Sequence, residues 1–410
     1  MSCGRRDRRD PQRLGVLLVA LLLLAACSNQ PVAHHSPATP TRTATPTPAP
    51  TPSIPACASA QTAATATGVS SPLPVLQLAA GLDEPEDVLV AADAIYVGEF
   101  GNGKIDAMPG LAGAPQPALL PVTIPEVEGI AFIGTTMYVA DQLHDRVVTV
   151  SGGQVQTFLQ LQPVPGVEGV DSVFADGQSL VVPDSPRGDV LIVGTDGQIQ
   201  HTLTGFARPV GGWVLTNGQL AIPDENRGAV IAVDPASGAQ TLLAGGLSLA
   251  DDVVQDSGGR IYAISIDQGR VVSIAGGAAQ DVASGLQQPQ GLGIDAANNL
   301  VVTEYTIGRV DLVVTTFKLL SPAAAAPALG PGQPLCVQLT RAPGYATPIS
   351  IAPGPGYRVV QQPGTGTEGS VEPVGCSGAC QVEVRVDSGT LHDTVLLGFQ
   401  APAPTATPTR

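Results

Sequence analysis

The sequence is poor in aromatic residues, in charged residues and in windows long enough for helices. Only 3% of its 410 residues are Phe, Trp or Tyr, and only 13% are charged. Its 48 glycines and 38 prolines break the chain so often that an architecture of long helices is excluded. Val, Leu, Ile and Ala remain in short runs between turn residues, a pattern that indicates many short strands and an all-β fold.

Basic residues are also scarce. The chain has 19 Lys and Arg against 35 Asp and Glu, a formal net charge of −16. Nucleic-acid binding needs clustered cations that neutralise phosphates, so DNA and RNA are excluded as partners. No Gly-x-Ser-x-Gly elbow, Gly-rich phosphate loop or His-Glu-x-x-His helix occurs either, and the five histidines open no strand of the repeats described below. These absences favour a protein that is not an enzyme.

One extended apolar run stands near the N-terminus. Five arginines precede Leu14–Leu24, and Ala25-Ala26-Cys27 follows it. A basic start, a short apolar stretch and small residues are typical of an export signal, and the run is too short to span a bilayer. The end of the run resembles a bacterial lipoprotein cleavage site, which implies that Cys27 is acylated and becomes the first residue of the mature chain. The alternative is an ordinary signal peptide with a chance cysteine.

We therefore expect residues 1–26 to be a lipoprotein signal peptide. The protein would be exported and anchored through Cys27 on the extracytoplasmic face of a membrane. Residues 27–72 carry a Pro/Thr-rich composition that cannot bury enough apolar surface to offset chain entropy, so we expect a disordered tether. Residues 401–410 share this composition and are expected to be a disordered tail.

The body of the chain is a repeat. An apolar strand ends near an acidic residue, and Gly or Asp follows four positions later. These strand ends lie 39 to 43 residues apart, at Glu99, Asp141, Asp184, Asp224, Ser265 and Glu304. Six units of this length with several strands each predict a six-bladed β-propeller over residues 73–320. Because the acidic residue recurs in nearly every unit, we interpret it as structural, through turn amides or pairs with Lys104, Arg146 or Arg187.

The repeat resembles that of NHL-type propellers. Tyr138-Val139-Ala140-Asp141, followed by Arg146-Val147, carries the resemblance, which covers about residues 73–316. The chain is also similar to gluconolactonase-like propellers, since Glu128-Gly129 matches their Glu-Gly pair. That second resemblance implies a metal-dependent lactone hydrolase, although Ile130 and Gly211 stand where the family has proline and asparagine.

The ring must also close. The sixth unit ends with its third strand, and Pro74–Leu78 precedes the first unit without a partner of its own. We predict that Pro74–Leu78 supplies the outer strand of the sixth blade, since an unpaired edge there would promote aggregation.

A second domain follows a Pro/Ala connector at residues 321–334. Alternating apolar residues over 335–400 predict a small β-sandwich. So small a domain gains from cross-links, and an exported chain permits disulfides. The candidates are Cys57, Cys336, Cys376 and Cys380. Four cysteines allow three pairings, which stay open, and a metal site is the alternative although no histidine neighbours them.

The candidate site lies where the innermost strands begin. Propellers bind ligands at this mouth of the central channel, and we expect six carboxylates to gather there: Glu86, Asp87, Glu128, Asp171, Asp251 and Asp252. Crowded carboxylates repel one another or recruit a cation, and oxygen ligands favour a calcium ion over zinc. The alternative is that they cap inner-strand backbone groups and face water.

The sequence thus predicts a monomeric, membrane-anchored lipoprotein whose propeller mouth binds a small extracytoplasmic ligand or an envelope protein. One alternative is a metal-dependent hydrolase of the lactonase type that uses the mouth carboxylates. A second alternative is a non-catalytic envelope scaffold, whose rim and sandwich serve as docking surfaces.

Overall fold

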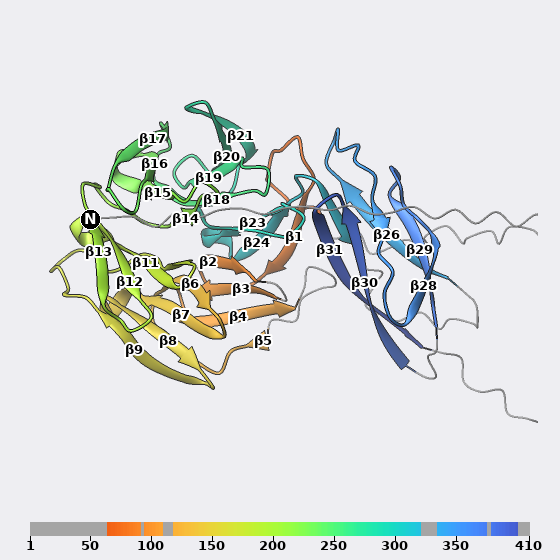
Figure 1. Cartoon of the computed structure of the whole chain (residues 1–410), viewed down its shortest axis with the longest axis horizontal. Helices are drawn as coiled ribbons and strands as arrows, with labels where there is room; N and C mark the ends of the chain where they lie inside the picture. Colours follow the sequence, from red (N-terminus) through yellow and green to blue (C-terminus); the bar gives the residue numbers. More distant parts are fainter. Residues whose placement is uncertain (1–63, 92–93, 110–117, 321–333, 375–378, 401–410) are drawn as a thin grey trace, which may run out of the picture. The chain divides into compact units, whose positions relative to one another are not determined.

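The computed structural model describes residues 64–91, 94–109, 118–320, 334–374 and 379–400 (Figure 1). The expected signal peptide, Cys27, most of the expected tether and the expected tail lie outside these residues. The described residues are built almost entirely from strands. None of their helices is long and apolar enough to cross a membrane.

Six four-stranded antiparallel sheets follow one another over the first three quarters of the described chain. The first contains β2 (Pro85–Val90), β3 (Ala94–Glu99), β4 (Lys104–Pro109) and β5 (Ala118–Leu119). The second contains β6 (Val127–Ile133), β7 (Thr136–Asp141), β8 (Arg146–Ser151) and β9 (Gln154–Gln160). The third contains β10 (Phe174–Asp176), β11 (Ser179–Asp184), β12 (Asp189–Gly194) and β13 (Ile199–Leu203). We call these sheets blades one to three.

The remaining three sheets continue the pattern. Blade four contains β14 (Trp213–Val214), β15 (Leu220–Asp224), β16 (Ala229–Val233) and β17 (Gln240–Gly245). Blade five contains β18 (Ala250–Gln255), β19 (Ile261–Ser265), β20 (Arg270–Ala275) and β21 (Ala278–Ser284). Blade six contains β22 (Pro289–Ile294), β23 (Leu300–Glu304), β24 (Arg309–Val313) and, from the start of the domain, β1 (Val75–Ala80). Apolar clusters packed between the blades form the cores, as where Val181 of blade three joins Leu220 and Ile222 of blade four.

Strand β1 closes the ring. It pairs antiparallel with β24, so that Val75 lies opposite Val313 and Ala80 lies opposite Arg309 (Figure 1). The predicted closure by Pro74–Leu78 is therefore confirmed. The physical reason is the one argued from the sequence, since β24 would otherwise leave its outer edge without hydrogen-bond partners.

A short turn joins the second and third strands of most blades. In four blades it contains a 3₁₀ helix: η1 (Gln142–His144), η2 (Ser185–Arg187), η3 (Glu225–Arg227) and η4 (Tyr305–Ile307). The residue after each helix is left-handed, and in blade three it is Gly188 with φ of 67°. A Cβ atom on Gly188 would lie 2.5 Å from the carbonyl oxygen of Phe206. This close approach explains the glycine of blade three, whereas blade two has Asp145 at the same turn position with φ of 50°.

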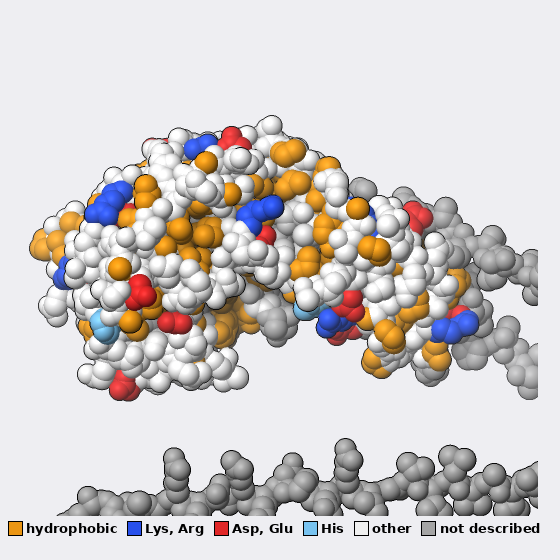
Figure 2. Space-filling model, turned by 45° about the horizontal axis from the view of Figure 1, so that its top comes forward, with side chains coloured by type: hydrophobic (Ala, Val, Ile, Leu, Met, Phe, Trp, Pro, Cys, Tyr) orange, Lys and Arg blue, Asp and Glu red, His pale blue; other side chains and the backbone are white. Residues whose placement is uncertain are grey.

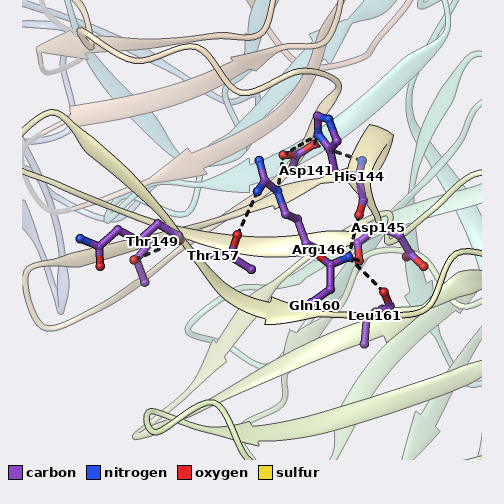
Figure 3. A network of polar contacts seen from close by, with 9 residues as sticks. Asp141, His144, Asp145, Arg146, Thr149, Thr157, Gln160 and Leu161 are labelled. Atoms are coloured by element: carbon purple, nitrogen blue, oxygen red, sulfur yellow. Dashed lines mark hydrogen bonds and ion pairs between the residues drawn. The ribbon is translucent and has the colours of Figure 1, made fainter.

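The recurring acidic residues sit at these turns and are buried. Asp141 accepts hydrogen bonds from His144 Nδ1 at 2.8 Å and from Arg146 Nε at 2.8 Å (Figure 3). In blade three, Arg187 contacts Asp184 at 2.9 Å. The predicted structural role is confirmed at these positions.

The end of the expected tether is ordered against the ring, so the boundary at residue 72 was wrong. Ser70 and Ser284 exchange backbone hydrogen bonds of 2.7 and 2.9 Å. Arg309 Nη1 donates to the carbonyl oxygen of Thr67 at 3.1 Å, and Ala66 is buried with the core of blades five and six. Backbone pairing at an open strand edge outweighs the unfavourable composition here.

The second domain consists of two facing sheets. One contains β25 (Phe317–Leu320), β26 (Leu335–Arg341), β29 (Glu368–Pro373) and β28 (Tyr357–Gln361). The other contains β27 (Ser350–Ile351), β30 (Ala379–Ser388) and β31 (Leu391–Gln400). Apolar side chains of both sheets, such as Val337 and Val384, form one core. A β-sandwich was therefore the right expectation.

The predicted start of the sandwich needs correction. Strand β25 pairs with β26, with Leu319 opposite Leu339, so the domain begins at Phe317 and not after the connector. The predicted propeller boundary at residue 320 therefore lies too far along the chain. Cys336 is disulfide-bonded. Cys57 and Cys376 lie outside the described residues, as does the side chain of Cys380, so the pairing stays a prediction.

Candidate functional site

A cavity of about 200 Å³ opens where the innermost strands begin. Six carboxylate side chains line it: Glu86, Glu128, Glu168, Asp171, Glu225 and Asp251. Four of them belong to the predicted set, and Glu168 and Glu225 were not predicted. Arg208, Gln142, Gln290, Phe100 and Tyr305 also contribute to the wall. The structure therefore brings four of the six predicted carboxylates together at one cavity.

A backbone irregularity positions the lining side chains. The innermost strands β2, β6, β18 and β22 each carry a register shift at the two residues that open the cavity, as at Glu86 and Asp87 between Pro85 and Val88. Such a bulge changes the direction of the side chains beside it. The first residue of each pair lines the cavity, and the second points elsewhere.

Four residues in a strained conformation precede these bulges. Glu84, Glu126, Leu249 and Gln288 have φ angles between 49° and 53°, which non-glycine residues rarely adopt. Each stands two positions before a residue that lines the cavity: Glu86, Glu128, Asp251 and Gln290. The same local strain thus recurs in four blades at the mouth, and strained backbone of this kind is often found at functional sites.

Asp87 and Asp252 do not line the cavity, so the expectation for these two was wrong. Asp87 Oδ2 accepts a hydrogen bond of 2.7 Å from the backbone N–H of Ile130 in blade two. Asp252 Oδ2 accepts one of 2.9 Å from Leu292 in blade six. Both carboxylates therefore join neighbouring blades, the role that the alternative interpretation had assigned to the mouth acids.

Arg208 is the site residue that sequence reasoning missed. Its Nη2 atom lies 2.8 Å from Glu168 and 2.9 Å from Asp171, and its Nη1 atom contacts Glu225. A signal was present, because Arg208 stands three residues before Gly211, the position that aligns with Glu86 and Glu128. No other repeat has a basic residue in that place.

Arg208 divides the acidic lining in two. The carboxylates of Asp171 and Glu225 raise the pKa of Arg208 although burial acts in the opposite direction, so its charge is permanent. Burial raises the pKa of Asp171 to about 6, and the charge of Arg208 limits that rise. Glu168, Asp171 and Glu225 therefore already have a cation.

The other three carboxyls form no ion pair with it. Burial raises the pKa of Glu86, Glu128 and Asp251 well above the ordinary values, and repulsion from neighbouring carboxylates adds to the effect, although the charge of Arg208 acts against it at Glu128. Within the described part of the chain, Asp251 accepts no hydrogen bond and forms no ion pair, although it lines the cavity. A cation that entered the cavity would thus meet three acidic groups that have no ion-pair partner among the described residues.

The lining does not form a preassembled metal site. Among the described residues, no group of three or more His, Cys, Asp or Glu side chains is arranged to hold a metal ion. Two of the carboxylates expected as calcium ligands face backbone N–H groups, and a third, Asp171, contacts Arg208.

One aromatic pair completes the wall. The rings of Phe100, from blade one, and Tyr305, from blade six, lie with their centroids 6.1 Å apart and are tilted by 57°. Both line the cavity. Aromatic faces attract organic cations, and the pair supplies apolar area beside the acids.

His144 does not enter this cavity. Its Nδ1 atom lies 2.8 Å from Asp141, and Arg146 binds the same carboxylate (Figure 3). Arg187 and Arg227 occupy the corresponding turn positions and contact the corresponding aspartates in blades three and four. This recurrence indicates that His144 stabilises the turn, as the arginines of the other blades do.

The chain was compared with known proteins. No protein-family model and no curated protein matches it. Its structure is similar to a luciferin-regenerating enzyme, with a TM-score of 0.51 and 12% identity over 58% of this chain and 94% of the other. It is similar to a gluconolactonase from Xanthomonas campestris, with a TM-score of 0.50 and 13% identity over 59% and 89% of the two chains. Together with the sheet topology, these likenesses show an all-β protein with a β-propeller fold.

Proposed function

We propose that the propeller mouth binds a cationic group of an extracytoplasmic ligand or protein partner, and that Cys27 anchors the protein to the membrane that it serves. The observation that carries the binding proposal is the imbalance of charge in the cavity. Six carboxylates line it against one arginine, and among the described residues Glu86, Glu128 and Asp251 form no ion pair with that arginine.

The chemistry of the wall favours an organic cation over a bare metal ion. Phe100 and Tyr305 offer aromatic surface, and Val210 and Ile266 add aliphatic surface. A guanidinium or ammonium group on an apolar stem satisfies both kinds of lining, because the charge meets carboxylates while the stem packs on the rings.

The test is a calorimetric titration of the full chain with n-butylguanidinium. We expect saturable binding that weakens about tenfold or more in Asp251→Asn, because a charged hydrogen bond contributes about 1.5–3 kcal/mol. Asp281→Asn is the matched control, since Asp281 is an exposed aspartate of blade five that contacts Arg270 and does not line the cavity. Absence of binding, or equal loss in both variants, would contradict the proposal.

A metal-dependent hydrolase of the lactonase type is the second candidate. The concentration of oxygen donors at one cavity favours it, since Glu86, Glu128, Asp171 and Asp251 all line the same wall. Calcium would have to rearrange these side chains, because no set of three is arranged to hold it in the described residues.

Thermal unfolding separates the two candidates. Calcium at one hundred times its dissociation constant would stabilise the folded chain by about 2.7 kcal/mol. A rise in Tm with calcium that Asp251→Asn removes, together with turnover of an aliphatic lactone, would favour the hydrolase. An unchanged Tm and no turnover of the lactone would exclude the hydrolase.

A further inference from the structure

Three exposed apolar side chains belong to the turns and the loop that also supply residues of the cavity wall. Leu143 is 56% exposed, Val167 is 50% exposed and Ile307 is 44% exposed. Each is close in sequence to a residue of the cavity wall, because Leu143 follows Gln142, Val167 precedes Glu168 and Ile307 stands two after Tyr305. We call Leu143, Val167 and Ile307 the apolar rim.

The rim extends the aromatic part of the wall. Ile307 belongs to η4 of blade six, the same turn as Tyr305, whose ring contacts Phe100 of blade one. Leu143 belongs to η1 of blade two, and Val167 to the loop that leads into blade three. The turns and loops through which four consecutive blades line the acidic cavity thus also carry apolar side chains.

A group of exposed apolar side chains indicates an interaction site, whereas a single one does not. Isolated exposed apolar side chains are ordinary on soluble proteins, whereas apolar groups gathered around a cavity mark an interaction site. The face in Figure 2 shows hydrophobic side chains spread among polar ones, with Lys and Arg as separate small groups. The rim differs because its members flank residues that line a single cavity.

We infer that the mouth receives an extended segment of a partner protein that carries an arginine or lysine between apolar residues. The inference rests on the proposed function, since the basic side chain would enter the cavity beside Asp251, Glu86 and Glu128. The cavity of about 200 Å³ exceeds the ~30 Å³ share of one water several times over, which suits one long side chain. The flanking apolar residues would pack on the rim.

A peptide segment is favoured as the partner because it can contact both the acidic cavity and the apolar rim. A small cation inside the cavity leaves the rim exposed, so it does not account for the rim. An anionic lipid surface would be repelled, because the cavity has six carboxylates against one arginine and the chain has a net charge of −16. A peptide segment reaches both features, since its side chains project a few ångströms apart along an extended backbone.

The experiment measures binding of two fluorescent peptides to the full chain by anisotropy. One has a central arginine between leucines, and the other has the same arginine between serines. We expect the leucine peptide to bind at least fivefold more tightly. The double variant Leu143→Ser and Ile307→Ser should remove this advantage and leave n-butylguanidinium binding unchanged.

A matched control uses other exposed apolar residues. Ile199 and Leu242 are 49% and 64% exposed on the outer strands β13 and β17, away from the cavity wall. Ile199→Ser with Leu242→Ser should leave both peptides unaffected. Equal binding of the two peptides, or equal effects of the two double variants, would overturn the inference while the proposed function stands. If the unmodified chain did not bind n-butylguanidinium, the proposed function itself would be overturned.

Discussion

Asp252 of blade five accepts a hydrogen bond of 2.9 Å from the backbone N–H of Leu292 in blade six. The same carboxylate accepts the N–H of Val253 at 2.7 Å. Asp87 repeats the arrangement between blades one and two, through Ile130. These aspartates connect consecutive innermost strands at the point where the cavity opens, so the site and the cohesion of the ring depend on adjacent residues.

Removal of this link should lower stability. Asp252→Ala would leave the buried N–H of Leu292 without its partner, which costs about 1–3 kcal/mol. We expect a lower midpoint in urea unfolding of the full chain. Asp281→Ala, on the exposed outer strand of the same blade, should change the midpoint by much less. Equal changes of the midpoint in the two variants would mean that the hydrogen bond between Asp252 and Leu292 does not stabilise the fold.

The pH dependence of stability follows from the same residue. Burial raises the pKa of Asp252 to about 7, although hydrogen bonds from Leu292 and Val253 oppose the rise. The unfolded chain titrates near 3.9, so the folded state holds more protons between about pH 4 and pH 7. Stability from this group is therefore greatest below about pH 4 and is lost as the pH rises to 7. Asp252→Asn should flatten the decline of Tm between pH 5 and pH 7.5, and an unchanged slope would contradict this assignment.

The sequence predicted features that depend on repetition. Six strand ends at regular spacing and an unpartnered segment at Pro74–Leu78 were enough to predict β-propeller closure, because every strand edge needs a partner. The predicted domain boundaries were wrong where a segment next to a blade pairs with an open strand edge. Ser70 pairs with Ser284 although its neighbours have the composition of a linker, and Phe317 continues into another sheet although it follows a blade strand directly.

The candidate site, too, could be predicted only in part from the sequence. Glu86 and Asp251 follow from the repeat register, but the register does not show that the bulge turns Asp87 and Asp252 toward the next blade. Arg208 comes from a loop, where no periodic pattern applies, and it neutralises half of the acidic lining. Arg208 is the one basic residue at this position among the six repeats. A search for residues that differ between the repeats would have identified it.

Backbone strain at the mouth gives another prediction. Glu126 has φ of 49°, immediately before β6. Glycine adopts this conformation without steric cost, so Glu126→Gly should raise stability by up to about 1 kcal/mol despite the added chain entropy. Gln156→Gly, in the exposed strand β9, should lower it by about 0.5–1 kcal/mol. Chemical denaturation of both variants decides the matter, and destabilisation of similar size in both would exclude strain at Glu126.

A buried ion pair in the sandwich can be tested in the same way. Lys318 is only 1% exposed, and its Nζ atom lies 2.7 Å from Asp393, which also accepts the N–H of Leu319. Lys318→Met would leave Asp393 buried without its cation and should cost about 3–5 kcal/mol. Addition of Asp393→Asn should recover part of that loss, because the amide oxygen still accepts the N–H of Leu319. A loss below 1 kcal/mol in the single variant would show that water reaches the pair.

Membrane anchoring depends on one side chain. If Cys27 carries the lipid, Cys27→Ala should abolish incorporation of labelled palmitate and release the protein into the soluble fraction of a bacterial host. Cys57→Ala is the control, since Cys57 follows a Pro/Thr-rich stretch and not an apolar run of the kind that precedes Cys27. Labelling that persists in Cys27→Ala would exclude the lipoprotein assignment.

Cation binding should have the opposite pH dependence to stability. The raised pKa values of Glu86, Glu128 and Asp251 mean that these carboxyls hold their protons to a higher pH than free carboxyls do, and burial raises the pKa of Asp171 to about 6. A cation prefers the ionised carboxylates, so its binding must displace protons and should strengthen several-fold from pH 5 to pH 8. Calorimetry of n-butylguanidinium binding in buffers of different ionisation enthalpy measures the protons released. Asp251→Asn should reduce that number as well as the affinity. Binding that is independent of pH and releases no protons would place the cation outside the cavity.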